Sequence, residues 1–598
     1  MTENRFRSKI IRTILILAFV MLPSWSIEGY TSENVESNST HGFSETLRDV
    51  VAGLDDEDVV AVWVFFDDNP TSSGFMKSNM SGPEPVSSRA RWRTSVRGRS
   101  SSDSKVLKAL PEERVQEVRN LVSRIRHISK YFNAVSVDVV VKDIELLLDL
   151  DFVIDVSVVR KYERSATVPN LDEVGNRSVD MLSDPWFTKY GESLEQLAMT
   201  GSSDLLEAGY NGSGTVLERD PVLICVMDTG FNLDHEAFDL LDILIEYDFV
   251  DYDSVTAQEE SDFPGQAGHG TIVLGVIAGY HHGDLIGPAW GARYILAKTE
   301  IVGQEIEIEE DKWVAGIEWA DSIGADIVTT SIGYSDWYNW ASMDGETALC
   351  TIAAEIAVSR GIVVVNAIGN YGRYGDPSLI APADGRNVIA VGALHRYGEI
   401  ANFSSGGPTA DGRIKPDLVA RGVDVHSVAN ESVSGYDQHN GTSFAAPLIA
   451  GLCAQLIEIH PEWDPGTLLG ELKTSASRSN DPDNDYGYGI PSGSVASGLS
   501  SETETSGILF QSGYPNPFSR NIRFDIFLPE WESVDLRIYN CAGELVATLL
   551  DYYPLKWGKS IVWDGCNRSG ARVASGVYFA RFVSDSTSKT IKVVYLKP

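Results

Sequence analysis

Two long apolar runs, each ending in a polar turn, constrain the fold of this 598-residue chain most strongly. Residues 222–227 lead into Asp228, and the apolar run within residues 361–370 ends in a Gly-Asn turn at Asn370. Continuous apolar runs of this length are typical of strands buried on both faces, as in a parallel sheet covered by helices. Catalytic groups gather at the carboxyl ends of such strands. We therefore expect an α/β fold, a mostly parallel sheet flanked by helices, with Asp228 and Asn370 at one edge.

Ser443 lies in the segment Gly-Thr-Ser-Phe-Ala-Ala-Pro, and the apolar run after it predicts a core helix. Gly441 allows a backbone conformation closed to other residues, and Pro447 is expected in the first turn of the helix. Near a helix N-terminus, unpaired N–H groups and the helix dipole favour a developing negative charge. A serine there can also be a simple cap. It becomes a nucleophile only with a base to take its proton and a third group to hold that base.

His269 provides a candidate base, because it directly precedes the apolar run 272–278 and is expected at a helix start. The chain order is then Asp228, His269, Ser443, which distinguishes one of the unrelated triad folds from the others. A triad also needs donors for the oxyanion, and losing one typically costs about 3 kcal/mol. The side-chain amide of Asn370 and the N–H of Ser443 are the candidate donors.

The segments around these four residues resemble, in order, the signature blocks of the subtilisin-like serine peptidases (subtilases). The resemblance covers residues 186–497 and implies a secreted endopeptidase, acting on proteins or peptides through an acyl-enzyme, that needs no cofactor or metal for catalysis. The segment Ser331-Ile332-Gly333 is similar to the Ser-Leu-Gly strand of that family, whose backbone binds substrate. The alternative from another class is a catalytically silent adhesion or binding protein that retains the fold.

Four aromatic residues depart from the pattern of that family. Many subtilases have a second glycine where this chain has Tyr334, and Trp337, Tyr338 and Trp340 follow closely. These side chains either narrow the substrate cleft or form an aromatic subsite, or they pack an inserted surface loop. The residue preference at the cleaved bond therefore does not transfer from the family.

Residues 481–487 carry carboxylates at alternate positions, as calcium loops do, but they lack the later bidentate glutamate of such a loop. Subtilases often have a structural turn of similar sequence here, so a calcium site and a plain turn both remain open. The resemblance to the family makes structural calcium an expectation, with no ligands assigned.

The N-terminus predicts export. Four basic residues among the first twelve precede the apolar run 13–22, and small residues follow, which is typical of a signal peptide over residues 1–26. An uncleaved N-terminal anchor is the alternative. The formal net charge of -37 argues against nucleic acid and anionic membrane surfaces as partners, because both attract clustered Lys and Arg.

Residues 27–165 resemble a subtilase propeptide, a small α+β module that acts as a transient inhibitor of its own peptidase domain. We expect a strand at residues 59–66, a helix around residues 112–130, and a β-α-β unit over residues 134–159. Five arginines between Arg89 and Arg99 form a basic stretch, which we interpret as a solvated loop. The alternative is that they dock against the acidic peptidase domain.

Residues 498–508 form a predicted linker, and short alternating strands follow, at residues 522–527, 534–539 and 576–582. This spacing predicts a small β-sandwich over residues 509–598. It resembles the immunoglobulin-like C-terminal sorting domain of the type IX secretion system. The resemblance implies secretion machinery as a partner and a route through the periplasm to the cell surface or the medium. A carbohydrate- or protein-binding module of similar form is the alternative.

The five cysteines lack the spacing of a disulfide framework. Cys225 and Cys453 fall in apolar runs and are expected as core thiols. Cys541 and Cys566 both lie in the last region, where they either pair or remain free. We expect the protein to be a monomer.

Overall fold

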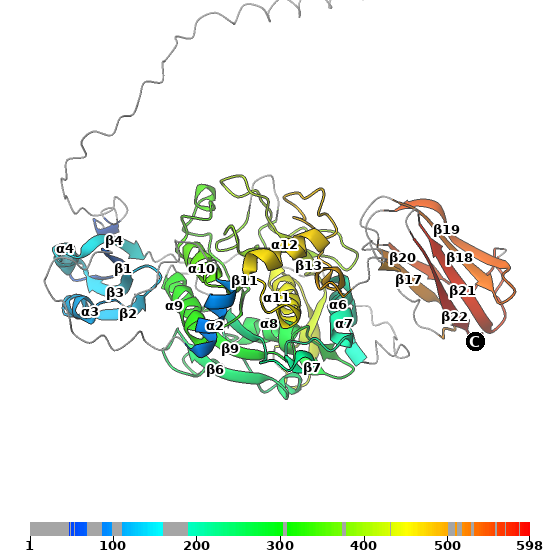
Figure 1. Cartoon of the computed structure of the whole chain (residues 1–598), viewed down its shortest axis with the longest axis horizontal. Helices are drawn as coiled ribbons and strands as arrows, with labels where there is room; N and C mark the ends of the chain where they lie inside the picture. The colour runs from blue at the N-terminus through cyan, green and yellow to red at the C-terminus, as the bar shows by residue number, and fades with distance from the viewer. Residues whose placement is uncertain are drawn as a thin grey trace, which may run out of the picture. The chain divides into compact units, whose positions relative to one another are not determined.

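The computed structural model describes residues 47, 50–52, 54–67, 87–98, 110–159, 189–302, 308–372, 378–430, 432–499, 509–510, 517–527, 532–555, 559–568, 570–584 and 587–597. The predicted signal peptide, most of the predicted linker and Arg99 lie outside these residues. Figure 1 shows the elements along the chain.

The central element is a seven-stranded sheet whose strands are ordered β13-β12-β11-β10-β5-β9-β6, and every pairing in it is parallel. Its strands are β13 (Leu418–Arg421), β12 (Ile389–Leu394), β11 (Val363–Ala367), β10 (Ile327–Thr330), β5 (Leu223–Asp228), β9 (Arg293–Lys298) and β6 (Asp242–Asp248). The two apolar runs that predicted buried strands form β5 and β11. The expected α/β architecture with a mostly parallel sheet is therefore confirmed.

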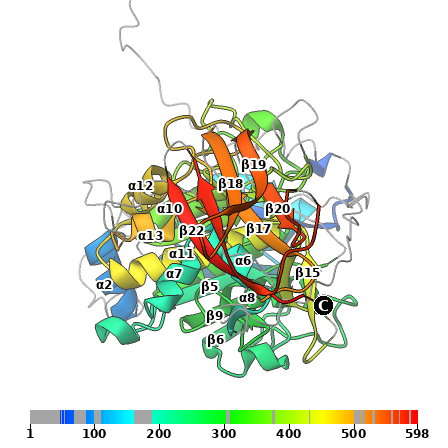
Figure 2. The same cartoon turned by 90° about the vertical axis from the view of Figure 1, so that its right-hand side faces the viewer.

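Helices cover both faces of this sheet (Figures 1 and 2). Ile224 and Val226 of β5 belong to a core shared with α8 (Gly268–Ala278) and α11 (Thr442–Ile459). Cys225 and Met227, which alternate with them, belong to a second core with α9 (Ile308–Ile323) and α10 (Leu349–Ser359). Successive side chains of a strand point to opposite faces, so a strand covered on both sides must be apolar throughout.

Shorter elements complete this part of the chain. They are α6 (Leu194–Met199), α7 (Ser202–Glu207), α12 (Pro465–Ser475) and α13 (Gly493–Ala496), with the hairpins of β7 (Tyr280–His281) with β8 (Leu285–Ile286) and of β14 (Val425–Val428) with β15 (Tyr436–His439).

Helix α11 differs from the sequence-based expectation at its start. Pro447 is the sixth residue of the helix and not part of the first turn, because α11 begins at Thr442. A proline inside a helix removes the bond to the carbonyl four residues earlier, here that of Ser443. The hydroxyl of Ser331 donates to this carbonyl over 2.7 Å and takes the place of the lost bond. The helix is long and apolar enough to cross a membrane, but 94% of it is buried inside the protein, as befits a core helix.

Residues 59–159 include a second sheet, of order β2-β3-β1-β4, with its own apolar core. Its elements are β1 (Val59–Phe66), α3 (Glu112–Arg119), β2 (Arg124–Ser129), β3 (Ala134–Val140), α4 (Ile144–Leu148) and β4 (Val153–Val159). The strand at residues 59–66 and the β-α-β unit are confirmed. The predicted helix over residues 112–130 is wrong in its second half, because residues 124–129 pair with β3 and this pairing overrides their helical pattern.

The basic stretch is not a solvated loop. Residues 88–97 form helix α2 (Ser88–Arg97), in which Arg93 and Arg97 are buried. The alternative interpretation, docking against acidic groups, is correct for Arg89, Arg93 and Arg97, whereas Arg91 is exposed.

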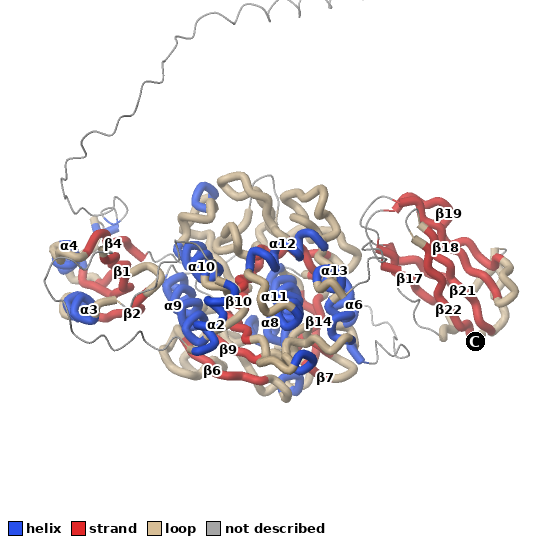
Figure 3. Tube along the Cα trace, viewed as in Figure 1, coloured by secondary structure: helices blue, strands red, loops and turns tan. Residues whose placement is uncertain are grey.

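After residue 517 the described chain consists of strands and loops, as Figure 3 shows. Two sheets, β16-β17-β20 and β19-β18-β21-β22, enclose a separate apolar core. Their strands are β16 (Leu509–Phe510), β17 (Ile522–Phe527), β18 (Glu532–Asn540), β19 (Leu545–Leu555), β20 (Lys559–Trp563), β21 (Gly576–Val583) and β22 (Ser588–Tyr595). This matches the predicted strands and sandwich. Cys225 and Cys453 are buried thiols, and Cys541 and Cys566 are both free.

Candidate active site

Asp228 and His269 come together at the carboxyl edge of the central sheet. Asp228 is the last residue of β5, and His269 is the second residue of α8. The His269 Nδ1 atom lies 2.7 Å from Asp228 Oδ1, which also accepts the N–H of Thr229 over 2.8 Å. A Cβ at Gly270 would lie 2.9 Å from the Cβ of Asp228, so a glycine is required for this close approach.

The environment of the pair favours a charged imidazole. The Asp228 side chain is fully buried, whereas that of His269 is 31% exposed. Burial lowers the pKa of His269, but the negative charge of Asp228 and its hydrogen bond outweigh burial and raise that pKa above the ordinary value of 6.5. A carboxylate held in this way fixes the orientation of the ring and stabilises its protonated form.

Ser443 is the second residue of α11 and is 7% exposed. Its hydroxyl donates to the carbonyl of Ser331 over 3.4 Å in this conformation, and not to His269. The ring of Phe444, the next residue, lies 5.8 Å from the ring of His269 between centroids, so the histidine is beside the turn that carries the serine. Gly441 has φ 153°, a value that favours glycine, and it sets the direction in which the chain enters the helix.

Asn370 is tied to the same helix start. Its side-chain oxygen accepts the N–H of Thr442 over 2.9 Å and the hydroxyl of Thr442 over 3.0 Å. Because the oxygen of the planar amide is engaged by α11, its NH₂ group is the end that can donate to another acceptor. Thr442 was not singled out in the sequence, although its position directly before Ser443 was a signal for this role.

Residues 331–333 continue from β10 towards the same place, and all three are partly exposed. The Ser331 hydroxyl holds the carbonyl of Ser443, and the carbonyl of Ile332 accepts the side-chain N–H of Asn366 over 3.2 Å. At Gly333 a Cβ would lie 2.6 Å from the carbonyl oxygen of Ala381, so the neighbouring segment packs against bare backbone. The structure therefore brings the predicted substrate segment next to the serine.

Three of the four aromatic residues that depart from the family pattern face the protein interior. Tyr334 is fully buried and donates its hydroxyl to Glu300. Trp337 and Tyr338 both donate to Glu310 of α9, over 3.2 Å and 2.9 Å. Of the four, only Trp340 is largely exposed. Packing is therefore the correct interpretation for Tyr334, Trp337 and Tyr338.

One acidic group among the described residues has the spacing of a metal site: Asp248, Asp251 and Glu259. The ammonium of Lys298, fully buried, lies 2.8 Å from Asp248 and 2.8 Å from Asp262. Burial lowers the pKa of Lys298, but its bonds to these two carboxylates outweigh burial and raise it. Subtilases often bind structural calcium, but these residues do not fit it, because a buried cation is already part of the group.

The other calcium candidate, residues 481–487, forms a tight turn. Asp483 accepts the N–H groups of Asp485 and Tyr486 over 2.8 Å and 2.7 Å, and it pairs with the guanidinium of Arg478. Because the carboxylate is engaged in this way, the geometry favours the structural turn.

Comparisons with known proteins show which proteins this chain is similar to. Residues 219–489 match the subtilase family of peptidases. Over 273 residues the chain is 32% identical to the subtilisin of Bacillus pumilus, covering 45% of this chain and 86% of that protein. It is 31% identical to subtilisin E of Bacillus subtilis, covering 45% of this chain and 62% of that protein. The crystal structure of fervidolysin from Fervidobacterium pennivorans, a keratinolytic enzyme related to subtilisin, aligns with 88% of this chain and 71% of its own, with 20% identity and a TM-score of 0.48.

The match of residues 219–489 to the subtilase family, together with the parallel sheet, places the protein in the class of serine-type endopeptidases. The identity shared with the Bacillus subtilisins is specific enough to name the family: the chain belongs to the subtilases and has the subtilisin fold.

Proposed function

We propose that this protein is a secreted serine endopeptidase, made as a zymogen, that uses Asp228, His269 and Ser443 as a catalytic triad. The single observation that carries the proposal is the 2.7 Å contact between His269 and buried Asp228, beside the turn that presents Ser443. The buried carboxylate orients the imidazole and raises its pKa, as a general base next to a serine requires.

In the proposed reaction the Ser443 hydroxyl first rotates away from the Ser331 carbonyl towards His269. His269 takes the proton as Ser443 Oγ bonds to the carbonyl carbon of the substrate, and the peptide C=O becomes an oxyanion. The Asn370 amide and the Ser443 N–H donate to this oxyanion. His269 then gives the proton to the leaving amine, so the C–N bond breaks and an acyl-enzyme remains. Water then attacks the acyl carbon while His269 takes its proton. The bond between the acyl carbon and Ser443 Oγ breaks, His269 returns the proton to Ser443, and the acid is released.

Residues 331–333 are proposed to bind the substrate backbone. Their partial exposure and their contact with the carbonyl of Ser443 support this role. Because Tyr334 points into the core, we propose that groups other than Tyr334, Trp337 and Tyr338 determine which residue the enzyme prefers at the cleaved bond.

A fluorophosphonate probe tests the catalytic proposal. The processed wild-type protein is expected to be labelled at Ser443, and Ser443→Ala is expected to remain unlabelled, because the probe reacts only with an activated serine. Absence of labelling in a correctly processed wild type, checked by N-terminal sequencing, would refute the enzyme mechanism and favour a silent binding protein.

We propose further that residues 1–26 direct export, that residues 27–165 act as the propeptide, and that the sandwich at residues 509–598 is a sorting domain. The separate apolar cores of the residue 59–159 module and the sandwich support this division. Deletion of the residues after 508 is expected to trap the protein in the periplasm of a bacterium with a type IX system. Normal export of the truncated protein would refute the sorting role.

A further inference from the structure

Helix α2 lies outside the sheet module of residues 59–159 in its contacts, although it comes between β1 and α3 in the chain. Its partners include Asp321 on α9, and Ala325 and Asp326 at the amino end of β10; Figure 1 shows α2 beside α9. Asp326, which binds two of its arginines, directly precedes β10 and also accepts the N–H of Leu223 over 2.9 Å. The candidate catalytic groups lie at the opposite, carboxyl ends of the same strands.

Three arginines, one helical turn apart or slightly more, make the contact. Arg93 is fully buried, pairs with Asp321, and donates to the carbonyl of Ala325 over 2.5 Å. Arg97 is 2% exposed, pairs with Asp326 over 3.0 Å and donates to the carbonyl of Pro461 over 2.5 Å.

Arg89 completes the row, with a side chain that is 27% exposed. It pairs with Asp326 and donates to the carbonyl of Pro221 over 2.7 Å. The helix start is held as well, because the Ser87 N–H donates to the carbonyl of Ser322 over 3.1 Å and its hydroxyl donates to that of Ile323. In this contact, carboxylate and carbonyl oxygens of the peptidase accept hydrogen bonds from each of the three guanidinium groups.

The sheet of the same N-terminal module has a separate set of contacts with α9. The Trp63 indole donates to Asp311 over 2.6 Å, Arg126 pairs with Asp311 over 3.1 Å, and the N–H of Lys130 donates to Glu318 over 3.0 Å. No residue of α2 takes part in these three contacts, although Tyr131 of the module and Arg93 of α2 both interact electrostatically with Asp321.

We propose that α2 is a second anchor of the N-terminal segment, one that binds an acidic site formed by Asp321 and Asp326 on the peptidase. The proposal rests on the proposed function only in that residues 27–165 act as a removable propeptide. After the chain is cut beyond residue 159, the N-terminal fragment dissociates only when the contacts of α2 and those of the module's sheet with α9 are broken at the same time. Two linked contacts raise retention by about 10²–10⁴ over either alone.

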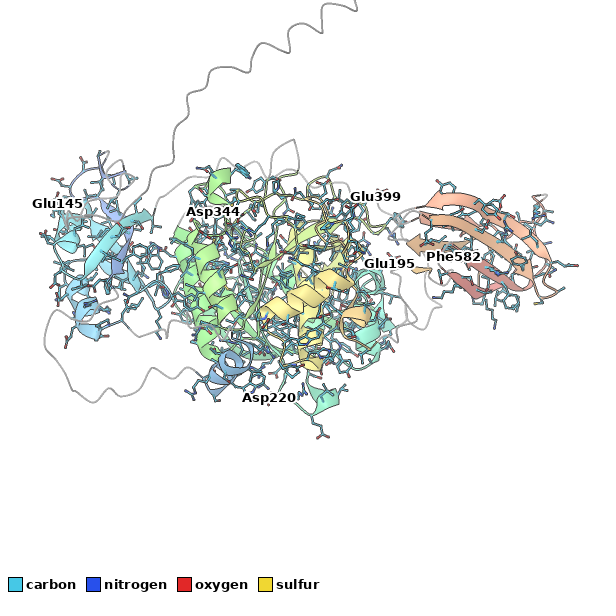
Figure 4. All side chains as sticks on the ribbon, turned by 45° about the horizontal axis from the view of Figure 1, so that its top comes forward. Glu145, Glu195, Asp220, Asp344, Glu399 and Phe582 are labelled. Atoms are coloured by element: carbon cyan, nitrogen blue, oxygen red, sulfur yellow. The ribbon has the colours of Figure 1, made fainter. Side chains whose placement is uncertain are left out.

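The charge of α2 supports the proposal that this helix binds Asp321 and Asp326. The chain has 85 acidic and 48 basic residues, yet α2 carries four arginines and no acidic residue in ten positions. The acidic side chains labelled in Figure 4, Glu145, Glu195, Asp220, Asp344 and Glu399, come from separate parts of the chain. The positive charge of this arginine-rich helix is therefore complementary to the carboxylates of Asp321 and Asp326.

The test uses the full-length chain with Ser443→Ala, which prevents self-processing, and a recognition sequence for a site-specific protease inserted between residues 160 and 188. After the cut, the rate at which the N-terminal fragment dissociates is measured by size-exclusion chromatography with mass detection. The variants are Arg93→Gln with Arg97→Gln, and Arg91→Gln as the matched control, because Arg91 is exposed on the same helix.

We expect the double variant to release the fragment at least about tenfold faster than the parent, and Arg91→Gln to differ by less than about twofold. Equal release from the double variant and the parent, or an equal acceleration by Arg91→Gln, would overturn the second anchor. If the double variant does not fold, Arg89→Gln replaces it, because Arg89 is partly exposed. We expect this variant to release the fragment about threefold faster than the parent, and equal release would overturn the proposal. The readout is retention in an inactive protein, so it is independent of the fluorophosphonate result.

Discussion

Replacement of Asn370 by alanine should remove a donor that acts only in the transition state. Loss of one oxyanion donor typically lowers kcat by about 10²–10³, which is about 3–4 kcal/mol of barrier. KM should change little, since the ground-state carbonyl gains little from this donor. The same change removes the acceptor for the Thr442 N–H, at 2.9 Å, and should lower the free energy of unfolding by about 1 kcal/mol.

Two further variants separate catalysis from stability. Asn370→Asp retains an oxygen for the Thr442 N–H but lacks the NH₂ group, so it should keep most of the stability and lose the activity. Thr442→Val removes only the hydroxyl contact at 3.0 Å and should lower kcat by about tenfold at most, through positioning.

The assay is steady-state cleavage of a fluorogenic peptide by the processed enzyme, with thermal unfolding measured in parallel. A folded Asn370→Ala protein that keeps kcat within about threefold of wild type would refute the assignment of the side chain to the oxyanion hole.

Three other outcomes follow from the contacts. The acid limb of the pH profile of kcat/KM should lie above pH 6.5, because His269 must be neutral to act as a base and its pKa is raised. Asp228→Asn should move that limb to lower pH and reduce kcat by about 10⁴-fold. A limb that stays in place would contradict the pairing of Asp228 with His269. Tyr334→Phe should lower the free energy of unfolding by about 1–3 kcal/mol, because buried Glu300 loses a hydrogen-bond donor. The same variant should leave the cleavage profile of a peptide library unchanged. An altered profile would place Tyr334 in the substrate cleft. Lys298→Met should lower the free energy of unfolding by about 3–5 kcal/mol at neutral pH, measured by chemical denaturation, and by less as pH falls. The reason is that burial raises the pKa of Asp248, so its unpaired carboxylate takes up a proton in the folded state. A deficit that does not vary with pH would contradict this charge argument.

The candidate site was largely predictable from local pattern. Asp228, His269 and Ser443 each stand at an end of a strand or helix that the apolar runs already define, and the parallel sheet brings those ends together. Asn370 was predictable as a residue after a buried strand, but its orientation depends on Thr442, which lies far from it in sequence.

Where prediction failed, a partner from another segment decided the outcome. Residues 124–129 became a strand because β3 offered backbone partners, although their sequence also suits a helix. The arginines of α2 became buried because Asp321 and Asp326 compensate their charge, and without such partners buried guanidinium groups are too costly.

The sequence by itself determined the parallel sheet, the subtilase family and the order of Asp228, His269 and Ser443, because apolar periodicity and short motifs are local properties of the chain. Only the tertiary structure decided that Tyr334 packs inward on Glu300, that Ser331 replaces the helix bond lost at Pro447, and that α2 docks on the peptidase. Each of these depends on a distant hydrogen-bond or charge partner, and the free energy of burying a polar group is set by that partner and not by the group alone.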